Sequence, residues 1–174
     1  GGGGIHALSS SVTVLNTVIS GNHAGDYGGG ISGFEASLDI SNCTITGNTA
    51  DLASGGGLYS KSAPSLKVTD CQITGNTADA GGGLTIGNSS AAARLEGNLI
   101  AYNSALGLYG QGKGGGIRAG GGAVIDIDRC TIFGNTAPSF PAIAPKDGGA
   151  PSKITRTSRT AASTDPSVVN ITNS

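Results

Sequence analysis

Three carboxylates close to two arginines form the group in this sequence whose residue types and spacing most suggest catalysis. Asp126 and Asp128 alternate in the run "VIDID", Arg129 follows them, and Glu96 takes the place of Asp128 one sequence repeat earlier, with Arg94 two residues before it. Enzymes that cleave polysaccharides use two or three such carboxylates, as acid and base or around a calcium ion. This acidic patch (Glu96, Asp126 and Asp128) makes a carbohydrate-active enzyme the third of three functions that we consider.

Thiols are the second group that could do chemistry. Three of them share one position of the repeat: Cys43, Cys71 and Cys130. Cys43 and Cys71 lie one repeat apart, so a disulfide between them is an alternative, although stacked side chains tend to point the same way. A zinc site is not expected, since neither His6 nor His23 falls at this position. We predict buried, free thiols that behave as small apolar residues.

Asparagine and glycine recur with a regularity that favours structure over chemistry. Five asparagines follow an apolar pair at intervals of 26, 28, 27 and 32 residues: Asn22, Asn48, Asn76, Asn103 and Asn135. Asn tolerates left-handed backbone angles and bonds local backbone, so we predict a structural ladder of stacked amides at a corner of the fold. The glycine triplets lack the Lys-Ser/Thr of a phosphate-binding loop, so we expect them to serve tight bends or close packing.

The elements that position these residues are short β-strands. Between neighbouring apolar residues the pattern has a period of two, which indicates strand rather than helix. The repeat aligns four apolar columns, one of which is Ile19, Ile45, Ile73, Ile100 and Ile132. Three strands per repeat of about 27 residues describe one coil of a parallel β-solenoid, in which equivalent residues stack about 4.8 Å apart. We predict an all-β fold of five to six such coils.

Composition excludes several classes of function. The chain has 174 residues, 32 of them glycine, and its ten basic and eleven acidic residues give a net charge of −1. Such a balance argues against nucleic acid as a partner. No apolar run approaches the roughly 20 residues of a membrane helix, so membrane insertion is not expected. No cofactor or metal is predicted.

Opposite charges on neighbouring repeats, Lys67 beside Asp39 and Arg94 beside Asp126, predict exposed ion pairs.

Two places interrupt the repeat. The loop "LGLYGQGK" is longer than its equivalents, and because loops that project from a solenoid often bind partners, its candidate contact residues are Leu106, Tyr109, Gln111 and Lys113. The spacing of Tyr27, Tyr59 and Tyr109 also allows them to share one side of the rod. Residues 1–137 hold the repeats, and 138–166 form a Pro/Ser/Thr-rich excursion that begins with a degenerate sixth strand at 141–144. Residues 167–174 are predicted to return as a solenoid strand.

The repeated phrases resemble those of a known family. "ISGN", "ITGN", "IAYN" and "IFGN", together with "GGGI" and "GGGL", are similar to the F-x-x-N and G-G-A-[ILV] repeats of polymorphic outer-membrane proteins, which are bacterial autotransporter adhesins, and of right-handed parallel β-helix proteins generally. The resemblance covers residues 1 to about 137, although Ile replaces Phe throughout. It implies a right-handed parallel β-helix, located extracellularly or at the bacterial cell surface.

Function follows from this resemblance only as an expectation, because the fold carries adhesins, fibres and enzymes alike. We expect first a non-enzymatic structural or adhesive segment, with surface glycans as one class of partner. The alternative is a subunit that stacks end to end into an extracellular filament. Neither end of the expected rod carries an obvious polar cap, so we also expect protein partners there, either the rest of a longer chain or further copies.

Overall fold

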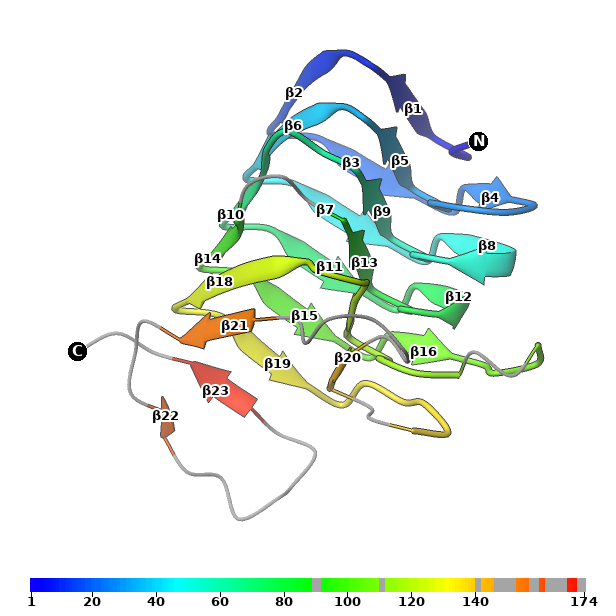
Figure 1. Ribbon diagram of the computed structural model, residues 1–174. Helices are drawn as coiled ribbons and strands as arrows, with labels where there is room; N and C mark the ends of the chain where they lie inside the picture. The colour runs from blue at the N-terminus through cyan, green and yellow to red at the C-terminus, as the bar shows by residue number, and fades with distance from the viewer. Residues whose placement is uncertain are drawn as a thin grey trace.

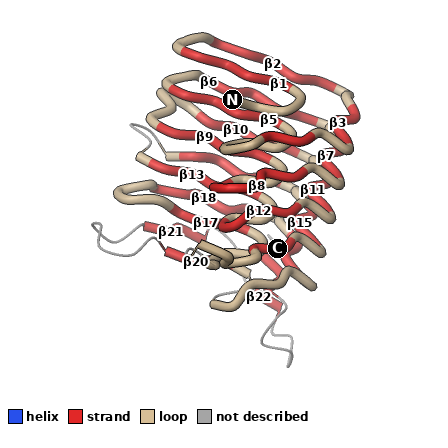
Figure 2. Tube along the Cα trace, turned by 90° about the vertical axis from the view of Figure 1, so that its right-hand side faces the viewer, coloured by secondary structure: helices blue, strands red, loops and turns tan. Residues whose placement is uncertain are grey.

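The computed structural model is an all-β solenoid in which the chain winds repeatedly through four sheets, and the strands of successive turns pair in parallel (Figure 1). It describes residues 1–88, 92–109, 112–139, 142–145, 153–156, 160–161 and 169–171. Each turn adds one strand to each sheet, so strands of successive turns lie side by side in rows (Figure 2). The described residues contain no helix, and hence none that could span a membrane.

The strands fall into four sheets, in each of which consecutive strands are hydrogen-bonded from one edge to the other. Sheet A contains β1 (Ile5–Leu8), β5 (Ile31–Phe34), β9 (Leu58–Lys61), β13 (Leu84–Gly87), β17 (Ile117–Ala119) and β20 (Ile143–Pro145). Sheet B contains β2 (Ser11–Leu15), β6 (Ser37–Ser41), β10 (Leu66–Thr69), β14 (Ala93–Glu96), β18 (Val124–Asp128) and β21 (Lys153–Arg156). Sheet C contains β22 (Thr160–Ala161), β23 (Val169–Ile171), β19 (Thr131–Phe133), β15 (Leu99–Ala101), β11 (Gln72–Thr74), β7 (Thr44–Thr46) and β3 (Val18–Ser20). Sheet D contains β16 (Ser104–Ala105), β12 (Thr77–Ala80), β8 (Thr49–Ser54) and β4 (His23–Ala24).

The predicted fold class is confirmed, with one correction to the coil. Four turns carry all four strands, a fifth carries β17, β18 and β19, and β20 and β21 begin a sixth, so the predicted five to six coils is slightly high if complete turns are counted. Each complete turn has four strands, whereas three were predicted. The missed strands form sheet D, where β4 and β16 are only two residues long, too short to show alternation.

The core is built from the apolar columns. Ile45, Ile73 and Ile100 pair in register on adjacent strands and are fully buried. The other three columns pair in the same way along sheets A and B. Because alternate residues of each strand point inward, every turn supplies one apolar layer to a continuous stack. The predicted register is therefore correct across the repeats.

Left-handed backbone angles occur one residue earlier than predicted. The five ladder asparagines do not take positive φ; the residue before each of them does: Gly21, Gly47, Gly75, Tyr102 and Gly134. Glycine adopts this conformation without the steric cost that a Cβ imposes, which explains its presence at four of the five positions. The preceding residue makes the turn, so the asparagine keeps an ordinary backbone conformation and its side chain points into the rod.

Beyond residue 138 the solenoid pattern weakens but continues in part. β20 pairs in parallel with β17 and overlaps the degenerate sixth strand predicted at 141–144. β21 pairs in parallel with β18 and lies where only an excursion was predicted, so this segment supplies a further strand of the sixth turn. The β-branched run "KITR" suits this pairing. β23, in the segment predicted to return, joins sheet C antiparallel to β19 rather than parallel. Most of 146–168 lies outside the described residues.

Candidate functional site

The asparagine column forms a ladder of side-chain amides inside the rod. Asn48 Nδ2 donates to Asn76 Oδ1 at 3.0 Å and to Ile19 O at 2.9 Å, and the Asn48 backbone N–H donates to the same Asn76 Oδ1 at 2.9 Å. The amide-to-amide bond recurs between each pair of neighbours: Asn22 and Asn48, Asn76 and Asn103, Asn103 and Asn135. These amide groups bond to one another and to backbone, so the ladder is a structural device.

Glycine triplets pack against this ladder. A Cβ on Gly57 would lie 2.8 Å from Gly83 O and 3.0 Å from Asn76 Nδ2. Real Cβ atoms do not sit so close to backbone oxygen, so only glycine lets the backbone approach the amide column. The triplets therefore serve close packing.

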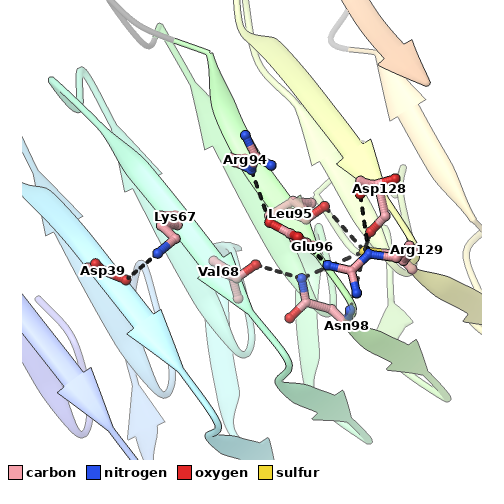
Figure 3. Close-up of polar contacts among 10 residues, drawn as sticks. Asp39, Lys67, Val68, Arg94, Leu95, Glu96, Asn98, Asp128 and Arg129 are labelled. Carbon is pink, nitrogen blue, oxygen red and sulfur yellow. Dashed lines mark hydrogen bonds and ion pairs between the residues drawn. The ribbon is translucent and has the colours of Figure 1, made fainter. Parts of the chain in front are cut away.

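Three buried thiols and one amide, Asn98, share the next column. Cys43, Cys71 and Cys130 are free and buried. The Cys71 N–H donates to Asn98 Oδ1 at 2.9 Å. Asn98 Nδ2 donates to Val68 O at 2.8 Å (Figure 3). Burial raises the pKa of Cys71 to about 11. A protonated, enclosed thiol is a poor nucleophile, so this column offers no reactive cysteine.

The acidic patch lies on the outer side of sheet B, where Glu96 and Asp128 form ion pairs with arginines (Figure 3). Glu96 accepts from Arg94 Nε at 3.1 Å and from Arg129 Nη2, and Arg129 Nε contacts Asp128 Oδ2 at 3.4 Å. The hydrogen bond from Arg129, and then that from Arg94, hold the pKa of Glu96 below its usual value. A general acid needs the opposite shift. Asp126, which is half-buried, pairs with Arg94 along the backbone register.

Other predicted residues lie apart from this patch. Lys67 Nζ is 3.9 Å from Asp39 Oδ1, as an exposed pair (Figure 3). In the predicted contact loop, Leu106 and Tyr109 are 45% and 60% exposed, and the Tyr109 N–H donates to Asp79 Oδ1 at 3.0 Å. Lys113 is half-buried and Gln111 lies outside the described residues. Within the described ranges, His, Cys, Asp and Glu side chains form no group of three that could hold a metal.

A concavity lies on the outer face of sheet A, at residues that the sequence did not single out as a site. This sheet A pocket has a volume of about 440 Å³ and is lined by residues that include Tyr27, Ser54, Tyr59, Lys61, Thr85 and Arg118. The Tyr27 and Tyr59 rings lie 4.4 Å apart between centroids, and Phe34 packs 5.2 Å from Tyr59. Burial, and then the neighbouring Tyr27, raise the pKa of Tyr59 to about 12.

Only one signal in the sequence pointed toward this pocket. The spacing of three tyrosines allowed a shared side of the rod, and two of them, Tyr27 and Tyr59, do meet there, whereas Tyr109 is not among the lining residues. Arg118 Nη1 donates to Ser54 Oγ at 3.0 Å, across 64 residues of sequence. Such a contact between different turns cannot be read from a repeat alignment that shows each turn separately.

Parallel sheets, inward ladders and a core of stacked apolar layers define the class of protein as a parallel β-helix. Comparison with protein families agrees, because the model described as "Right handed beta helix region" matches residues 1–150. The chain belongs to this right-handed β-helix family. The comparisons with curated proteins and with solved structures gave no match.

Proposed function

We propose that this chain is a non-enzymatic segment of a bacterial cell-surface or secreted protein with a structural or adhesive role. The observation that carries the proposal is the ladder from Asn22 to Asn135, whose buried amides bond to one another through successive turns. Hydrogen bonds between successive turns keep the rod rigid and hold its outer faces in fixed positions. A rigid outer face is suited to present a binding surface. The resemblance of the repeats to those of autotransporter adhesins supports the location.

Adhesion by the purified chain tests this proposal. Beads coated with the native protein should be retained on epithelial or bacterial cells several-fold more than beads coated with the same protein after thermal unfolding, because the folded surface carries the contacts. Equal retention of the two kinds of bead would contradict the adhesive role.

A second candidate is end-to-end assembly into an extracellular filament. β1, β2, β3 and β4 each pair on one side only, and the same turn carries the exposed apolar side chains of Leu8, Leu15 and Val18. Strand edges of this kind are templates for further β-pairing. Electron microscopy of the purified protein separates the two candidates: long fibres would favour assembly, and dispersed short rods would remove it.

A carbohydrate-active enzyme is the third candidate, and the ion-paired state of Glu96 argues against it. The double variant Glu96→Gln/Asp128→Asn provides the test. If the wild-type protein cleaves any polysaccharide of a broad panel and the double variant does not, the enzymatic proposal replaces the adhesive one.

A further inference from the structure

The sheet A pocket contains the features of a ligand site rather than of a packing defect. Its volume of about 440 Å³ falls within the roughly 300–1,000 Å³ that is typical of small-molecule sites. Three of its residues belong to successive strands in one outward column, since Tyr59 pairs with Thr85 and Thr85 pairs with Arg118. At about 4.8 Å per strand, this column spans about 10 Å.

A buried hydroxyl without a partner marks the middle of the column. Thr85 is 4% exposed, lines the pocket, and its Oγ1 makes no hydrogen bond. This oxygen is itself enclosed and lies against Gly81, which does not line the pocket. Thr85 therefore offers a bound molecule side-chain surface between Tyr59 and Arg118 and not a hydrogen bond.

Glycines keep the space beside this column open. The neighbouring outward position is occupied by Lys61 on β9, by Gly87 on β13 and by Gly120 after β17. A Cβ on Gly87 would meet only Gly120 Cα at 3.9 Å, an ordinary contact, so packing does not require glycine there. The absence of side chains at Gly87 and Gly120 creates room next to Thr85 and Arg118.

The charge of the lining favours an anion. Lys61 and Arg118 both line the pocket, and none of its lining residues is acidic. Ser54 accepts from one guanidinium nitrogen of Arg118 and so orients the group. Arginine binds planar carboxylates through paired N–H donors, which makes a carboxylate the best-matched anion.

The tyrosines favour a ring with polar substituents over a flat base. The Tyr27 and Tyr59 rings are tilted by 36° with centroids 4.4 Å apart, so they pack on each other and leave no slot between them for a planar base. They offer apolar ring surface together with polar hydroxyls. A sugar ring, with C–H groups on one face and hydroxyls at its rim, matches this combination.

We propose that the sheet A pocket binds an acidic saccharide, a pyranose ring that carries a carboxylate, with Arg118 and Lys61 at the carboxylate and Tyr27 and Tyr59 against the ring. The proposal rests on the adhesive function proposed above and names its ligand class. Uronic acids and sialic acids share this chemistry, and binding experiments can separate them.

Calorimetric titration of the purified protein with galacturonate oligosaccharides, glucuronate oligosaccharides and sialyllactose tests the proposal, with galactose oligosaccharides and lactose as neutral counterparts. At least one acidic ligand should bind at least ten-fold more tightly than its neutral counterpart. Binding of the uronates alone or of sialyllactose alone identifies the source of the carboxylate. Equal binding of acidic and neutral sugars, or no binding of any, overturns the proposal.

Variants connect the binding to the pocket. Arg118→Ala should weaken binding at least ten-fold, whereas Arg94→Ala, which removes an equally charged group from sheet B, should leave it unchanged. Gly87→Val should block the pocket. Unchanged binding in Arg118→Ala and Gly87→Val would also overturn the proposal.

The bead assay distinguishes this inference from the function on which it rests. If beads coated with Arg118→Ala adhere to cells as well as wild-type beads do, adhesion stands and the pocket is not its site. If the protein binds acidic sugars in solution but coated beads do not adhere, the pocket stands and the adhesive role fails.

Discussion

Asn76 shows how much a single ladder residue contributes. Its Oδ1 accepts from the backbone N–H and the Nδ2 of Asn48, and its Nδ2 donates to Ile45 O and to Asn103 Oδ1, all between 2.9 and 3.0 Å. Each buried group left without a partner costs about 1–3 kcal/mol. We predict that Asn76→Ala lowers the free energy of unfolding by about 3 kcal/mol or more, measured by denaturant titration.

The end of the same ladder provides the control. Asn22 is half-buried, and its side chain donates to Asn48 Oδ1 at 3.0 Å. Asn22→Ala should therefore cost no more than about 1.5 kcal/mol, the net contribution of one hydrogen bond. Similar losses in the two variants would contradict the inference that the cost depends on how many buried hydrogen bonds each side chain makes.

Thiol chemistry gives a second prediction for single residues. Burial raises the pKa of Cys71 to about 11, so the folded protein keeps this proton to higher pH than the unfolded chain, whose thiols titrate near 9. The contribution of the Cys71 thiol to the free energy of unfolding is fully present below pH 9 and is lost as the pH rises from 9 toward 11. Cys71→Ala should flatten this fall in the free energy of unfolding, followed by denaturant titration at several pH values.

Reactivity toward a thiol reagent checks the same burial independently. At pH 8 the thiols of the native protein should react slowly with a disulfide reagent. The unfolded protein should react at once and release three equivalents of the reagent's thiol, one for each of its cysteines. Rapid labelling of the native protein would contradict the enclosed column.

At this scale, what the sequence predicts depends on repetition. The columns of Asn48, Cys43 and Ile45 were predictable because similar residue types recur once per repeat and the alternation of the strand indicates an inward side chain. The sheet A pocket was not, because Tyr59, Thr85 and Arg118 are different residue types in one column. A site made of differences between turns leaves no periodic signal.

Among the elements, the strands of sheets A, B and C could be predicted and those of sheet D could not. Three to five residues of alternating polarity reveal strands such as β6, whose five residues alternate in burial. The two-residue strands β4 and β16 have no measurable period and pair because they follow the ladder asparagines. Pairing there depends on the geometry of the preceding turn.

The bends between elements give a matched pair of glycine substitutions. A Cβ on Gly56 would lie 2.4 Å from Thr77 O and 2.5 Å from Gly82 O, whereas a Cβ on Gly25 would meet nothing within 4 Å. We predict that Gly56→Ala destabilises the protein by about 3 kcal/mol, because the backbone must shift. Gly25→Ala should change stability by less than about 1 kcal/mol and in the favourable direction.

Thermal denaturation followed by circular dichroism measures both variants. Equal melting temperatures for Gly56→Ala and the wild type would show that the triplet bend tolerates a side chain and that close packing does not explain these glycines.

The whole molecule behaves as a stack, since each turn contacts mainly the turns before and after it. In such proteins stability is approximately a sum over repeats and their interfaces, so one complete repeat can be removed without loss of the fold. Deletion of residues 49–76 joins Asn48 to Thr77, whose equivalent in the deleted turn is Thr49. All columns then remain in register.

We predict that this deletion yields a folded rod shorter by about 4.8 Å with a lower melting temperature, seen by small-angle scattering and circular dichroism. Deletion of residues 49–62 removes half a turn, places Ala63 after Asn48, and shifts every later column out of line, so this variant should not fold. If the two deletions behave alike, either both folded or both unfolded, the columns are not what holds the rod together, and the same ladders that predicted the fold would fail to explain its stability.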